Sequence, residues 1–116
     1  MTILFLSTGC IFEKPVSNNP KGIVEAYMQD LKDGNYKAAV KLLNTEASQG
    51  TSQATFTKSK EKLISLYGPE AFSQIIITVA SQGDKIAKVS VKLNGMKSED
   101  LTFNLVKENN SWKIGK

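Results

Sequence analysis

Cys10 is the one cysteine of the chain and the residue best suited to covalent chemistry. A lone thiol cannot form an internal disulfide, and the chain has no histidine that could activate it as a nucleophile. The residues before it indicate a different role. An apolar run at residues 3–6 is followed by the small residues Thr8 and Gly9, and the thiol comes directly after them. Small residues behind an apolar stretch are typical of a signal cleavage site.

This segment resembles the signal sequence of a bacterial lipoprotein, in which a peptidase cuts before a cysteine that receives a lipid. The resemblance implies that residues 1–9 are a residual signal segment, that Cys10 is the lipid attachment site, and that the mature protein is extracytoplasmic with the membrane as a partner. Diacylglycerol on the thiol supplies two acyl chains, which hold a protein firmly on a bilayer. The pattern departs from the usual one at Ser7, which stands where a large aliphatic residue is expected, and no lysine precedes Lys14. The alternative is a cytoplasmic chain whose thiol packs against the core.

The residues that follow the cysteine have the composition of a tether. Residues 10–21 contain two prolines, one serine and two asparagines without a helical or strand period, which is typical of an extended linker. Residues 22–116 are enough for one compact domain and too few for two. They contain no run of about 20 apolar residues that would span a membrane. We therefore expect a single domain held off a surface by a flexible segment.

The charged residues exclude several kinds of site. The net charge of +4 comes from lysine alone, because the chain has neither arginine nor histidine. Arginine is the preferred side chain for bidentate recognition of phosphate or carboxylate, and histidine is the commonest metal ligand. Gly83 and Gly95 are typical of hairpin turns rather than of a phosphate-binding loop. We predict no metal and no cofactor. We also predict no nucleic acid as a partner, because the lysines lack accompanying aromatic platforms.

Two carboxylates are the candidates for acid–base catalysis. Asp30 lies one turn from Tyr27 in a predicted helix, and Asp100 opens a predicted strand. A pocket carboxylate with a tyrosine donor is the machinery of a small isomerase or dehydratase. However, Asp30 falls at the boundary of an apolar stripe and Asp100 follows Glu99 in a polar loop, so we expect both to be solvated. Such an enzyme is therefore the alternative to a protein without catalytic activity.

Helices in the first part of the domain must position these residues. Asn19-Pro20 predicts a helix start, apolar residues then recur at helical spacing, and Gly34 ends the helix. A predicted second helix is capped by Asn35 and has the inner face Tyr36, Ala39, Val40 and Leu43. Residues 44–55 are predicted to form a loop and residues 56–67 a third helix. The lysines of that helix are predicted to be mostly solvated: Lys58, Lys60 and Lys62.

From Phe72 onward the hydrophobic period changes from 3.6 to 2, which predicts strands. We expect these over residues 72–80, 88–93, 101–105 and 112–114, with a turn at Asn109-Asn110. Short connections predict an antiparallel meander, and the helices can cover its apolar face to give an α+β fold. Lys88 and Lys92 are expected on the outer face of the sheet. That face is the one through which a homodimer would form.

The joint between the first two helices and the end of the chain carry a resemblance to a known family. The joint is residues 33–39, and the end comprises residues 105–108 and 111–114. Together with the helices-then-meander order, they resemble the small bacterial lipoproteins of unknown function with a nuclear-transport-factor-2-like (cystatin-like) domain. The resemblance spans about residues 22–114. It implies a cone-shaped fold, with N-terminal helices packed on a curved antiparallel sheet of about four strands and often a pocket at the wide end. It implies the fold far more than the function.

Five large side chains are expected between the first helix and the concave side of the sheet: Tyr27, Met28, Phe72, Phe103 and Trp112. They either line a pocket for a small apolar or amphipathic ligand or fill a closed core. The sequence thus predicts a lipid-anchored, extracytoplasmic, non-catalytic binding or accessory domain at the bacterial cell surface. Its expected partner, besides the membrane, is a small apolar ligand or an envelope protein.

Overall fold

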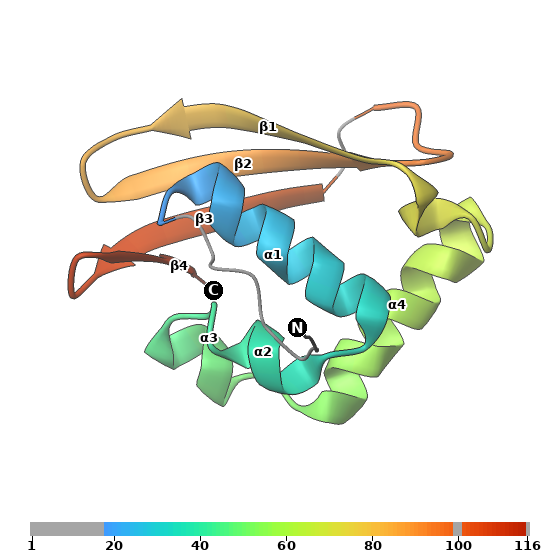
Figure 1. Ribbon diagram of the computed structural model, residues 1–116, viewed down its shortest axis with the longest axis horizontal. Coiled ribbons are helices and arrows are strands. Elements are labelled where there is room, and N and C mark those ends of the chain that lie inside the picture. The colour runs from blue at the N-terminus through green and yellow to red at the C-terminus, as the bar shows by residue number, and fades with distance from the viewer. Residues whose placement is uncertain (1–17, 99–100, 116) are drawn as a thin grey trace, which may run out of the picture.

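Helices come first and strands second in the computed structural model, which describes residues 18–98 and 101–115. The strands are β1 (Ile75–Gln82), β2 (Ile86–Leu93), β3 (Leu101–Glu108) and β4 (Ser111–Ile114). They form one antiparallel sheet in the order β1-β2-β3-β4, with helices packed on it (Figure 1). The α+β class and the meander are therefore confirmed. Cys10 and Asp100 lie outside the described residues.

The first helix, α1 (Pro20–Asp33), is the one that the sequence predicts. The side-chain oxygen of Asn19 accepts a hydrogen bond from the N–H of Gly22 at 2.8 Å, which satisfies one of the free donors at the helix start. The helix ends at Gly34, whose φ of 73° lies in the left-handed region that glycine adopts without steric cost. Contacts with β1, β2 and β4 place α1 across the sheet (Figure 1).

The second helix, α2 (Tyr36–Val40), is shorter than predicted. Leu43 was expected on its inner face, and this prediction was wrong, because the segment after the helix pairs with β4. Leu43 forms a parallel bridge with Ile114, whose N–H donates to the Leu42 carbonyl at 2.8 Å. The N–H of Asn44 donates in turn to the Ile114 carbonyl at 2.9 Å. This pairing provides hydrogen-bond partners for backbone groups that would otherwise be unpaired at the edge of the sheet.

Residues 44–55 were predicted to form a loop, and this prediction was also wrong. They contain α3 (Thr45–Gln49) and the start of α4 (Gln53–Tyr67). Asn44 caps α3 by accepting a hydrogen bond from the N–H of Ala47 at 2.7 Å. Ser52 and Thr55 form a reciprocal capping box at the start of α4. Local side-chain caps therefore stabilise helix starts in a sequence too polar to show a helical period.

The strands begin and end close to the predicted residues, with one correction. Phe72 was expected in the first strand but lies in η1 (Ala71–Ser73), a short 3₁₀ turn, and β1 begins at Ile75. The predicted turn between β3 and β4 is confirmed. Asn109 and Asn110 both have positive φ, 53° and 64°. That conformation matches the twist of a two-residue hairpin, and asparagine tolerates it better than most residues.

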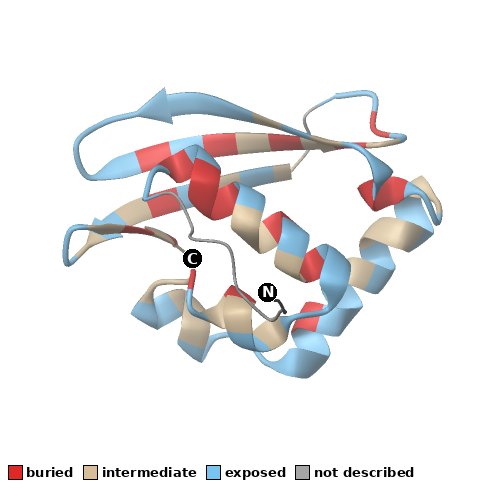
Figure 2. Ribbon diagram, in the orientation of Figure 1, coloured by how far each residue is buried: buried red, intermediate tan, exposed pale blue. Residues whose placement is uncertain are grey.

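The core lies between α1 and one side of the sheet (Figure 2). Every second residue of β2 is buried there: Ala87, Val89, Val91 and Leu93. Val24 and Met28 of α1 are fully buried on the facing layer. Between the buried residues of β2, Lys88 is exposed and Lys92 is half-buried, and these alternate positions point to the other face of the sheet. The prediction that both lysines lie on the outer face is confirmed.

Candidate functional site

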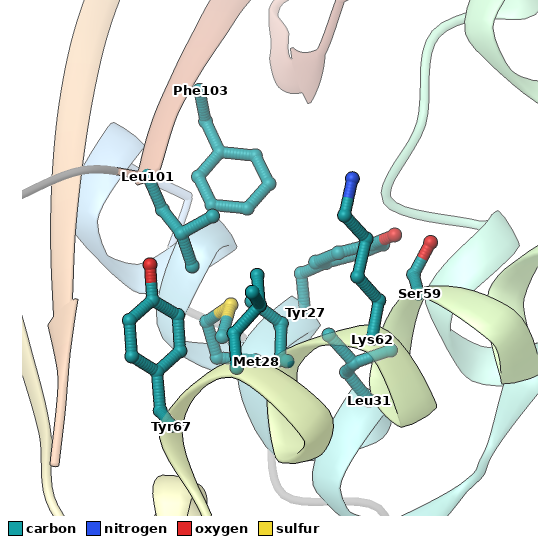
Figure 3. Close-up of a pocket in the computed structure, with 10 residues that line it drawn as sticks. Tyr27, Met28, Leu31, Ser59, Lys62, Tyr67, Leu101 and Phe103 are labelled. Atoms are coloured by element: carbon teal, nitrogen blue, oxygen red, sulfur yellow. The ribbon is translucent and has the colours of Figure 1, made fainter. Parts of the chain in front are cut away.

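A cavity of about 360 Å³ lies between α1, α4 and β3 (Figure 3). Its lining is contributed by Tyr27, Met28 and Leu31 of α1, by Ser59, Lys62, Leu63, Leu66 and Tyr67 of α4, and by Leu101 and Phe103 of β3. Each set follows the period of its own element. Residues three or four apart share a helix face, and alternate residues share a strand face. The cavity is therefore a product of how α4 packs beside α1 over the sheet.

Carbon atoms form most of the lining. Met28 has 0% of its surface exposed and Leu31 has 3%, so the α1 side is part of the core as well as the cavity wall. Tyr27 makes edge-to-face contacts with Phe103 and Phe56, at ring-centroid distances of 5.7 and 6.1 Å. Such contacts fix ring orientation as well as adding to burial. This wall is consequently rigid and apolar.

The rim on the α4 side is more open. Leu66 lines the cavity although 60% of its surface is exposed. Ser59 and Lys62, on the same helix, are exposed too. The apolar surface of this leucine is in contact with water beside an apolar cavity. A ligand that covered this surface would gain binding free energy from the hydrophobic effect.

Four side chains bring polar atoms to the lining: Tyr27, Ser59, Lys62 and Tyr67. Burial raises the pKa of the Tyr27 hydroxyl above its usual value of 10.0, because the phenolate would lose hydration. The Ser59 hydroxyl donates to the Thr55 carbonyl at 3.0 Å. Within the described part of the chain, neither the Tyr27 hydroxyl nor the Lys62 ammonium makes a hydrogen bond or an ion pair. The Tyr67 hydroxyl makes none with the described residues either, so three donors are available to a bound molecule.

The structure separates the five side chains that were expected together. Tyr27, Met28 and Phe103 line the cavity. Phe72 and Trp112 do not, and their exposed fractions of 6% and 4% place them in the closed core. Met28 belongs to both groups, because it is a core residue that also lines the cavity.

The α4 side of the site is what sequence reasoning missed. Lys62 was predicted to be solvated and is exposed, yet it also lines the cavity. Ser59, Leu63, Leu66 and Tyr67 recur at spacings of three and four along α4, so they share one face of that helix. This period is the signal that could have grouped them. Asp30, the carboxylate considered for catalysis, does not line the cavity.

The titration of Tyr27 provides a first prediction. The difference between the tyrosinate absorbance curves of the wild type and of Tyr27→Phe should have its midpoint above pH 10.0. Because the folded-state pKa exceeds the unfolded one, the contribution of Tyr27 to stability is full below pH 10.0 and is lost as the pH rises through the folded-state pKa. The wild type should therefore lose more stability than Tyr27→Phe above that pH. A midpoint at or below 10.0 would show that the hydroxyl is hydrated.

Two structural screens concern the described residues alone. Within residues 18–98 and 101–115, histidine, cysteine and carboxylate side chains form no group of three or more that could hold a metal ion. No helix in these ranges has the length and apolar character that crossing a membrane requires.

Comparison of the chain with models of known protein families gives no match, and comparison with curated proteins gives none. The functional argument therefore starts from the cavity itself.

Proposed function

We propose that this protein is a non-catalytic binding domain, held at the outer side of a bacterial membrane by a lipid on Cys10, whose cavity takes a small apolar or amphipathic molecule. The observation that carries the proposal is the cavity between α1, α4 and β3. Its volume of about 360 Å³ falls in the range of small-molecule sites, which are mostly apolar with a few placed polar groups. Of the ten described residues that line it, six are Leu, Met or Phe.

Binding is favoured over catalysis by the side chains that the cavity offers. An isomerase or dehydratase needs a carboxylate or histidine base at the bound substrate. The lining residues that the structure describes include neither, and Asp30 is not one of them. Tyr27, whose pKa burial raises above 10.0, is a hydrogen-bond donor rather than a base at neutral pH.

The proposal extends to the fold. Helices packed on a four-stranded antiparallel sheet are compatible with the cone-shaped nuclear-transport-factor-2-like domain of small bacterial lipoproteins. A pocket between helices and sheet is what such a domain would offer. The cavity residues on α1 and β3 are in keeping with that arrangement.

An uncharged apolar dye tests the proposal. N-phenylnaphthylamine fluorescence should rise on binding to residues 18–116 or to the whole chain. Ser59→Trp should weaken binding at least tenfold, because the indole occupies the cavity beside Ser59. Ser65→Trp is the matched control, since Ser65 is exposed on the same helix and does not line the cavity. Equal dye binding by both variants, or none by the wild type, would refute the proposal.

A further inference from the structure

The lysines of this domain differ in what their ammonium groups contact. Lys60 donates to the Lys32 carbonyl at 2.6 Å, and Lys113 donates to the Lys41 carbonyl at 2.7 Å. Lys107 lies over the Trp112 ring, 5.6 Å from its centroid. Lys62 has no such partner within the described residues, and it is the one charged side chain among those that line the cavity.

The polar atoms at the cavity are arranged for an anion. Figure 3 shows the Lys62 ammonium, the Tyr27 hydroxyl and the Ser59 hydroxyl on one side of the cavity and the Tyr67 hydroxyl on the opposite side. The ammonium carries a positive charge, and the neutral Tyr27 hydroxyl adds a donor. Among the described residues, no carboxylate lines the cavity to neutralise the lysine. A cationic ligand would therefore meet repulsion, and a neutral one would leave the ammonium without a counter-charge.

The rest of the lining suits an alkyl chain. Met28, Leu63, Leu101 and Phe103 contribute apolar walls, and the exposed Leu66 adds apolar surface at the rim. Burial of each methylene group in an apolar environment is favourable, so a chain of several carbons gains most of its affinity here. The head group then decides selectivity.

From this arrangement we infer that the cavity selects a single-chain anionic amphiphile, with the head group on Lys62 and Tyr27 and the chain between α1, α4 and β3. The inference rests on the proposed function, because it names the ligand class of the same cavity. The anionic head has two sources, a free carboxylate amphiphile or a lipid in an anionic bilayer. Both present the same chemistry to Lys62.

Competition with the bound dye measures the selectivity. Decanoate and 1-decanol have the same chain length and differ in charge at neutral pH. The wild type should bind decanoate about tenfold more tightly than decanol, and Lys62→Gln should abolish that preference by weakening decanoate binding far more than decanol binding. Lys58→Gln is the control, because it removes the same charge from an exposed position of α4 outside the lining. The preference should shrink as salt is added, because the ammonium is solvent-exposed.

The outcomes distinguish a failure of the anion selectivity from a failure of the proposed function. If the wild type binds both ligands equally, or Lys62→Gln weakens both alike, the anion selectivity is refuted and the apolar binding site stands. If the dye, the acid and the alcohol all fail to bind, the proposed function fails too. Vesicles of phosphatidylglycerol and of phosphatidylcholine identify the source. Displacement by anionic vesicles that depends on Lys62 supports a membrane lipid, and displacement by decanoate alone supports a free amphiphile.

Discussion

Replacing Trp112 with alanine should lower the free energy of unfolding by about 3–5 kcal/mol. Trp112 is the one tryptophan of the chain and lies in the four-residue strand β4 with only 4% of its surface exposed. Its backbone N–H donates to the Asn18 side chain at 3.1 Å, and the Lys107 ammonium lies over its ring. Removing the indole leaves a large void between β4 and α1 that these neighbours cannot fill. Since domains of this size are stable by about 5–15 kcal/mol, the variant should be marginally folded.

Urea denaturation followed by circular dichroism measures this loss. Trp112→Phe is the matched variant and should cost less, because most of the buried aromatic volume is retained. Trp112 does not line the cavity, so folded Trp112→Phe should bind the apolar dye as the wild type does. A loss below about 1 kcal/mol for Trp112→Ala would show that the ring is not a core residue. Impaired dye binding by folded Trp112→Phe would instead place it at the site.

The parts of the fold that the sequence predicts are those stabilised by local interactions. The α1 helix has a cap at Asn19, a proline at its first position and a glycine at its end. The β3–β4 turn has two asparagines in a conformation that few other residues tolerate. Both are specified within a few residues of sequence, and both are confirmed.

The parts that could not be predicted depend on distant contacts. The chain leaves α2 early because Leu42, Leu43 and Asn44 pair with β4, some seventy residues later in the chain. No local pattern indicates that pairing. Phe72 and Trp112 are as apolar as Phe103, so residue type alone does not separate core residues from cavity residues. The distinction follows from how α4 packs against α1, which also brings Lys62 to the cavity.

The second large effect is expected from loss of the predicted lipid attachment site in the N-terminal segment. The full chain, expressed in a bacterial host, should be recovered in the membrane fraction, with residues 1–9 removed and a diacylglyceryl mass on Cys10. Cys10→Ala should move it almost completely to the soluble fraction and keep residues 1–9. The effect is close to all-or-none, because each buried methylene contributes about 0.8 kcal/mol and two chains are needed for stable anchoring.

A substitution at Ser7 should increase processing rather than abolish it. Ser7 occupies the position at which the resembled signal has a large aliphatic residue. Ser7→Leu should raise the processed fraction, and Ser17→Ala, in the predicted tether, should leave it unchanged.

A soluble, unmodified wild type that begins at Met1 would refute the anchor. It would leave the proposed binding site standing, because the described residues that line the cavity belong to α1, α4 and β3. The anchor determines where the domain acts, and the cavity determines what it binds. The two experiments can therefore fail independently.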